Sequence, residues 1–125
     1  MKVPNSKLVN SVDSLQSIGK LNLPVKTSFA IAVTLKEIDD ALTVFNAERE
    51  KIINKYAELN EYNQPKVNEQ GNVIITNVPD FNKDLNELLA IEVELNVNPI
   101  SVEALGDIQL PPTSLMSISW ILTND

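Results

Sequence analysis

A long apolar stripe with helical spacing constrains the fold of this chain more than any other feature. Its members follow one another at intervals of four and three residues, and only Arg49 interrupts them. Such a repeat places the side chains along one side of a helix, and another helix must cover that side. The chain is therefore expected to be built around a helical packing surface. The stripe consists of Ile31, Leu35, Ile38, Leu42, Phe45, Ile52, Tyr56 and Leu59.

The helix that carries the stripe is expected to run from about residue 24 to residue 59, because proline suits a first helical turn. This helix would be roughly 50 Å long, whereas a compact domain of this size is only about 30 Å across. Its first turns, residues 29–33, are apolar on all sides and are expected to lie inside the domain.

A first helix is expected over residues 5–18, with Asn5 or Ser6 as its N-cap. Gly19 is expected to end this helix in the left-handed conformation. A helix of this length can cover only about half of the stripe. The other half is expected to be covered by a second subunit.

The second half of the stripe supplies the predicted interface. Arg49 either sets the register of the helices by pairing with a carboxylate or lies with its aliphatic stem along the seam. Trp120 is a candidate aromatic anchor on the apolar C-terminal segment, with burial in the core as its alternative role. The predicted interface residues are Leu42, Phe45, Arg49, Ile52, Tyr56, Leu59 and Trp120.

Strands are expected only after the long helix. Asn, Gln, Pro and Gly dominate residues 60–72, which predicts a loop, and Gln70-Gly71-Asn72 lies between two short apolar runs as in a hairpin turn. The clearest strand is expected over residues 91–97, where apolar and polar side chains alternate. Together these segments predict a small antiparallel sheet.

Further helices are expected over residues 80–89, with Asp80 as the N-cap, and over residues 114–122. A single helical turn over residues 101–105 is expected to stop at Gly106. The predicted fold class is thus α+β: a helical hairpin with one long amphipathic helix, a small antiparallel sheet and a C-terminal helix. One domain, residues 1–125, is expected to contain a helical hairpin (1–60), a loop and hairpin (61–79) and a helix-strand-helix segment (80–125).

The composition argues against most catalytic chemistry. The chain has no cysteine and no histidine, which removes thiol nucleophiles, zinc-thiolate sites, the usual general base and the commonest metal ligand. Two carboxylate pairs remain as candidates for acid-base chemistry or for binding a cation: Glu92 with Glu94, and Asp39 with Asp40. Both pairs are better explained as solvent-exposed surface residues. We therefore expect no enzyme activity, no cofactor and no metal.

The charge balance also limits the partners. Seventeen acidic and ten basic residues give a net charge of −7, and the basic residues are scattered along the chain. A protein that binds the phosphate backbone needs a basic stripe, so no direct contact with nucleic acid is expected. No apolar run reaches about 18 residues, and residues 1–5 turn polar where a signal peptide would carry its apolar region. A cytoplasmic protein without a membrane contact is therefore expected.

Several short segments, spread over the chain up to about Glu94, are similar to known sequences. They are Val3-Pro4-Asn5, Leu23-Pro24-Val25-Lys26, Asn46-Ala47-Glu48-Arg49, Lys55-Tyr56, Phe81-Asn82-Lys83, and Glu87-Leu88-Leu89 with Glu92-Val93-Glu94. With these segments the chain resembles a family of small proteins of tailed bacteriophages and prophages. The resemblance implies a viral origin and a location in the cytoplasm of an infected bacterial host or in the virion. It implies no particular activity for this chain.

Two functions agree with these features. The first is a non-enzymatic phage structural or assembly protein that self-associates through its long helix and contacts other virion proteins. The alternative is a small anti-defence or host-takeover protein that binds and inhibits a bacterial defence complex, or sequesters its signalling nucleotide. Nucleotide binding fits less well, because only Lys26, Arg49 and Lys55 lie near the predicted interface to hold phosphates.

Overall fold

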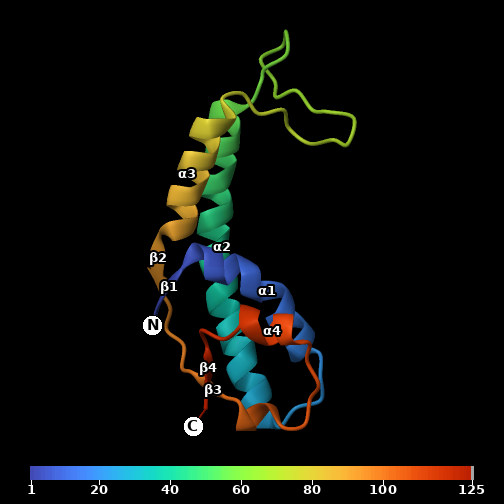
Figure 1. Ribbon diagram of the computed structural model, residues 1–125, viewed down its shortest axis with the longest axis vertical. Coiled ribbons are helices and arrows are strands. Elements are labelled where there is room, and N and C mark those ends of the chain that lie inside the picture. Colours follow the sequence, from blue (N-terminus) through green and yellow to red (C-terminus); the bar gives the residue numbers. More distant parts are fainter. Residues whose placement is uncertain (125) are drawn as a thin grey trace. The chain divides into compact units, whose positions relative to one another are not determined.

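A computed structural model describes residues 1–124 and confirms the α+β class (Figure 1). The chain divides into two compact units, unit 1 (residues 1–42 and 92–124) and unit 2 (residues 43–91), and α2 contributes to both. The single domain stays a prediction. The described elements are β1 (Lys2–Pro4), α1 (Asn5–Gly19), α2 (Val25–Tyr56), α3 (Val78–Ala90), β2 (Glu92–Glu94), β3 (Ile100–Ser101), the 3-10 helix η1 (Glu103–Leu105), α4 (Pro112–Ser117) and β4 (Leu122–Thr123).

The first helix lies where the sequence places it, but neither of its ends is formed as expected. Pro4 is the N-cap residue and makes no side-chain capping bond. Gly19 is the last residue of α1 and does not have a positive φ, because the chain leaves the helix at Lys20 with φ −88°. A Cβ at Gly19 would lie 3.6 Å from Cδ1 of Leu35. This glycine therefore lies close to α2 and does not form a left-handed cap.

The predicted long helix is confirmed as one unbroken element, α2. No proline or glycine occurs between Val25 and Tyr56, so nothing interrupts its backbone hydrogen bonds. The helix ends three residues earlier than expected. The reason is that Ala57 and Leu59 pair as β-bridges with residues later in the chain, Ile75 and Pro65.

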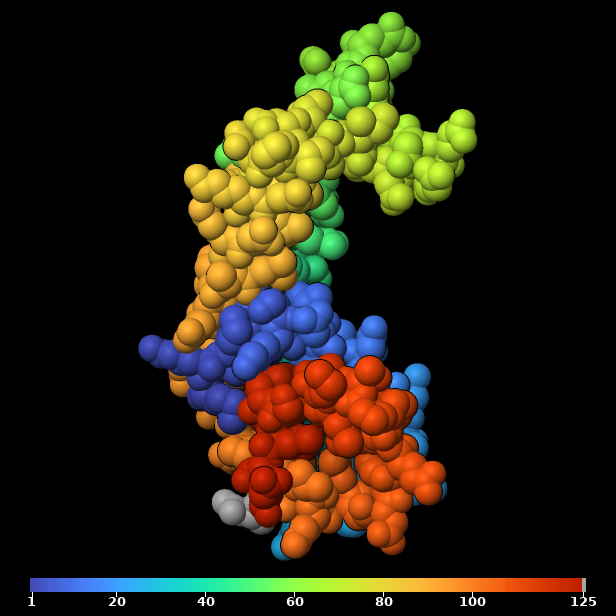
Figure 2. Space-filling view, in the orientation of Figure 1, coloured from blue at the N-terminus to red at the C-terminus, as the bar shows by residue number. Residues whose placement is uncertain are grey.

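The core of unit 1 is formed by one face of α1, the inner face of α2 and the C-terminal segments. Leu8, Leu15 and Ile18 lie on α1 at helical spacing, and all three are buried. The other buried members of this apolar cluster are Val3, Ile31, Ile38, Leu95, Ile100, Leu105, Ile118 and Ile121. Helices α1 and α4 pack side by side in this unit (Figures 1 and 2).

Two small sheets complete unit 1. Strands β1 and β2 are antiparallel, with Val3 opposite Val93, and this sheet confirms the prediction of a small antiparallel sheet. Strand β2 is shorter than the strand predicted over residues 91–97, and among residues 1–124 no strand pairs with residues 96–99. Strands β3 and β4 form a parallel pair that the sequence does not predict.

The C-terminal helix is shorter than predicted. Helix α4 begins at Pro112, a favoured first-turn residue, and ends at Ser117. The hydroxyls of Ser117 and Ser119 donate to main-chain carbonyls three residues earlier, 2.7 and 3.0 Å away. Such local bonds compete with helix formation, and the chain continues through turns into β4.

In unit 2, α3 packs against the C-terminal part of α2. The rings of Tyr56 and Phe81 meet edge to face, with centroids 6.1 Å apart. Asn77, in the left-handed conformation, is the N-cap of α3, and its side-chain oxygen accepts from the N–H of Asp80. The prediction of Asp80 as the N-cap is therefore wrong. The helix itself is confirmed and begins slightly earlier than expected.

Between α2 and α3 the chain forms a compact three-segment element, which we call the tip (residues 56–76; Figure 1). Three central residues bind one another in a closed ring of main-chain hydrogen bonds. Glu58 donates to Ile74 (2.8 Å), Ile74 donates to Lys66 (2.9 Å) and Lys66 donates to Glu58 (2.8 Å). These residues are eight positions apart in the sequence.

The two loops of the tip repeat the same turn at the same interval of eight residues. The side-chain oxygen of Asn60 accepts two main-chain N–H groups, at 2.8 and 3.0 Å, and that of Asn68 accepts two at 3.0 Å. Each turn has a residue with positive φ three positions later, Asn63 and Gly71. The tip is therefore an internal repeat, whereas the sequence predicts one hairpin here.

Candidate functional site

The most exposed apolar feature of the long helix is a ridge at its N-terminal end. Val25, Phe29 and Val33 lie four residues apart, and their exposed fractions are 85%, 70% and 37%. We call these three residues the α2 ridge. At 100° per residue the ridge lies on the side of the helix opposite the buried Ile31 and Ile38. The prediction that residues 29–33 lie wholly inside the domain is therefore wrong.

A groove runs beside the α2 ridge, between α2 and the segment that follows β2. It has a volume of about 230 Å³, and none of the residues that line it is charged. The main-chain N–H groups of residues 96–98 have no hydrogen-bond partner within the described part of the chain. The lining residues are Phe29, Ala30, Val33, Thr34, Asn96, Val97, Asn98 and Pro99.

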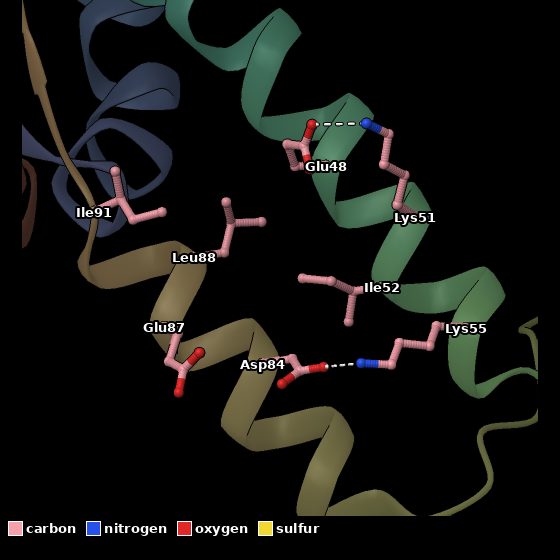
Figure 3. A pocket seen from close by; sticks show the side chains of 8 residues that line it. All are labelled: Glu48, Lys51, Ile52, Lys55, Asp84, Glu87, Leu88 and Ile91. Atoms are coloured by element: carbon pink, nitrogen blue, oxygen red, sulfur yellow. Dashed lines mark hydrogen bonds and ion pairs between the residues drawn. The ribbon is translucent and has the colours of Figure 1, made fainter.

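Unit 2 contains a second concave surface, which we call the α2–α3 cleft (Figure 3). It has a volume of about 300 Å³. Ile52, Leu88 and Ile91 supply its apolar part, and Ile91 is 53% exposed. The charged lining residues are Glu48, Lys51, Lys55, Asp84 and Glu87.

Most of the charges around the α2–α3 cleft are already paired. Lys51 lies 3.0 Å from Glu48, and Lys55 lies 3.1 Å from Asp84 (Figure 3). Within residues 1–124, Glu87 makes no ion pair. Paired lysines are poorly placed to hold an anionic ligand, so the cleft is better explained as the surface of the contact between the two helices.

Asp84 is the centre of that contact. Its carboxylate accepts the hydroxyl of Tyr56 at 2.7 Å and the ammonium of Lys55 at 3.1 Å. The bond from Tyr56, followed by that from Lys55, lowers the pKa of Asp84. The same carboxylate raises the pKa of both Lys55 and Tyr56. The three groups therefore hold α3 to α2 through a charge-assisted network.

Three of the predicted interface residues are covered within unit 2 or buried. Phe45 is only 5% exposed. Ile52 is half-buried at the α2–α3 cleft, and half-buried Tyr56 contacts Phe81 and Asp84 of α3. Helix α3 thus occupies the position along Ile52 and Tyr56 that the sequence analysis assigned to a second subunit.

The remaining predicted interface residues are spread over different surroundings. Leu42 is half-buried against the core of unit 1, and so is Trp120, whose indole N–H has no partner within residues 1–124. Arg49 is exposed and forms no ion pair among the described residues. Leu59 lies beyond α2, in the tip, and is 50% exposed. Leu42 and Trp120 thus belong to unit 1, and the other five residues belong to unit 2.

One carboxylate of each candidate acidic pair is engaged in an ion pair. Asp40 pairs with Lys36 at 3.2 Å, and Glu94 accepts from the amino group of Met1 at 3.0 Å. No group of three acidic side chains in residues 1–124 is arranged to hold a metal ion. Among the helices of these residues, none combines the length and apolar character needed to cross a membrane.

Sequence reasoning missed the α2 ridge and the repeat of the tip. Both have a signal in the sequence. The residues at 25, 29 and 33 share one helical face, but the adjacent Ala30, Ile31 and Ala32 hide that face in a run that is apolar on all sides. In the tip, Leu59-Asn60-Glu61 and Val67-Asn68-Glu69 recur after eight residues.

No family model, curated protein or solved structure matches the chain.

Proposed function

We propose that this chain is a non-enzymatic structural or assembly protein of a bacteriophage that self-associates through its long helix. The observation that carries the proposal is the α2 ridge, three successive exposed apolar residues on one face of α2. Exposed apolar patches of this kind are typical of protein interaction sites. The viral origin rests on the resemblance of the short segments described above.

The N-terminal end of α2 is a better candidate for self-association than the residues around Ile52 and Tyr56. Those residues already contact α3, whereas Val25 and Phe29 are largely exposed. Aromatic residues at the centre of an interface commonly contribute much of the binding energy. Phe29, in the middle of the ridge, is therefore the expected anchor.

The first experiment measures mass in solution by sedimentation equilibrium over a wide range of protein concentration. The unmodified chain should form an oligomer, and Phe29→Ser should weaken association by about tenfold or more. The matched control is Val44→Ser, since Val44 is also an apolar residue of α2 and is 64% exposed. Equal weakening by both variants, or a chain that stays monomeric, would contradict the proposal.

A second experiment tests the biological assignment. Quantitative mass spectrometry of purified virions should find the chain at a fixed copy number per particle if it is a structural component. Absence from virions, together with co-purification of a bacterial defence protein from infected cells, would favour the anti-defence function.

A further inference from the structure

We infer that the partner of the α2 ridge is a second copy of this chain, and that Phe29 of each copy enters the groove of the other. This inference rests on the proposed function and adds the partner, the symmetry and the receiving groove. It begins from two features that lie next to each other in unit 1: the ridge, and the groove that Phe29 and Val33 line from one side.

The ridge and the groove are complementary in shape. Residues four apart on a helix form a ridge, and helices pack by inserting such ridges into grooves. Here the ridge is Val25, Phe29 and Val33, and the adjacent groove has a volume of about 230 Å³. Because both features belong to the same surface patch, two copies related by a twofold axis satisfy both at once.

The charge distribution permits a second copy at this surface more readily than at the rest of unit 1. Each chain has a net charge of −7, so two copies repel each other over most of their surfaces. The groove is lined only by uncharged residues, and the ridge is uncharged as well. Two copies can therefore meet here without bringing carboxylates of the contact surfaces together.

The wall of the groove formed by residues 96–99 combines an apolar centre with a polar, solvent-exposed edge. Asn96 and Asn98 are exposed, while Val97 is half-buried against the core of unit 1. An incoming phenyl ring would contact Val33, Val97 and Pro99, and the amides would remain in water at the edge. An apolar centre with a polar rim is the usual organisation of a protein interface.

The test uses a groove variant and a control with the same change of charge. The groove variant is the double substitution Asn96→Glu and Asn98→Glu, at two exposed positions. The control is Asn82→Glu with Asn86→Glu, two exposed asparagines of α3. By sedimentation equilibrium, the groove variant should dimerise about tenfold or more weakly than the control. Equal dimerisation of the two would overturn the inference.

Mixing two defective chains provides a second readout. Phe29→Ser lacks the ring, which is also one wall of its own groove, but leaves the other groove residues uncharged. The groove variant keeps the ring but has a charged groove. Neither homodimer retains a ring in a groove, whereas the mixed dimer retains one of the two contacts. The mixed dimer should therefore be tighter than either homodimer, and its failure to exceed them would also overturn the inference.

The outcomes separate the inference from the proposed function. If Phe29→Ser weakens the dimer and the groove variant does not, self-association through the ridge stands. The inference that Phe29 enters the groove is then overturned. A monomeric unmodified chain would overturn self-association itself and, with it, this inference.

Discussion

At the scale of single residues, Asp84 of α3 binds two polar side chains of α2. It accepts hydrogen bonds from Tyr56 and Lys55 and thereby joins α3 to α2. Neither the stripe in α2 nor the helical pattern around residue 84 predicts this carboxylate, because both patterns report only apolar spacing. A pair 28 positions apart in the sequence cannot be recognised until the helices are placed side by side.

The network around Asp84 should make stability dependent on pH. The pKa of the Asp84 carboxyl group is lowered in the folded chain. The stabilisation is therefore fully present at pH values above the ordinary carboxyl pKa, and it is lost as the pH falls through the lowered pKa. Asp84→Asn should lower the melting temperature at neutral pH, and the difference from the unmodified chain should shrink in acid. Thermal unfolding followed by circular dichroism measures both. Glu87→Gln, in the same cleft but without an ion pair among residues 1–124, is the control and should show a smaller effect at neutral pH.

Two glycines should respond in opposite ways to the same substitution. Gly106 has φ 67° and ψ −141°, a conformation that side chains with a Cβ rarely adopt, so Gly106→Ala should reduce the free energy of unfolding by about 1–3 kcal/mol. Gly19 is helical and an added Cβ would make ordinary contacts at 3.6 and 3.7 Å, so Gly19→Ala should be neutral or stabilise by about 0.5–1 kcal/mol. Urea denaturation measures both. A destabilising Gly19→Ala would contradict this explanation.

At the scale of elements, the long helix could be predicted almost completely, but its exposed side could not. Its extent follows from an apolar repeat without proline or glycine. Which side of it is covered depends on α1 and α3, and their positions are set by contacts distant in sequence. Residues 29–33 are apolar on all sides, so periodicity gives no means of choosing the exposed face there.

The tip offers a prediction about cooperative local structure. Replacing Asn68 by Ala removes an acceptor for two main-chain N–H groups and should weaken the tip by about 0.5–1.5 kcal/mol for each lost bond. Hydrogen exchange should then accelerate at the ring amides of Glu58, Lys66 and Ile74, while the amides of α1 remain protected. Asn60→Ala should produce the same pattern, because Asn60 forms the equivalent turn. Acceleration confined to the loop of the replaced residue would contradict the closed ring.

At the scale of the whole molecule, net charge should control self-association. Two chains of charge −7 repel each other, and salt screens this repulsion over a Debye length of about 10 Å at 0.1 M. Association through an uncharged surface should therefore become stronger as sodium chloride is raised. Sedimentation equilibrium at low and high salt measures the change. Weaker association in salt would instead indicate attraction between opposite charges and contradict the contact proposed here.

The sequence predicts the class of fold better than the details of the strands. Fold class follows from helix length and from alternating residues near Val93, which need only local patterns. The parallel pairing of β3 with β4 and the separate pairing of β1 with β2 depend on segments about 20 and 90 positions apart. The sequence predicts one hairpin for the tip because each of its three segments is shorter than a typical strand. Alternation over so few residues is too brief to reveal the repeat.

The ring of the tip has a consequence for aggregation. In each bridge the two opposing side chains point to the same face, so the exposed apolar residues Leu59 and Pro65 share one face. On an ordinary hairpin such a face would lie beside long open edges to which other chains could add strands. Here each segment is short and is bonded to both of the others through its central residue. A short edge offers another chain little backbone to pair with, so the tip is expected to be a poor template for fibrils although it displays apolar side chains to water.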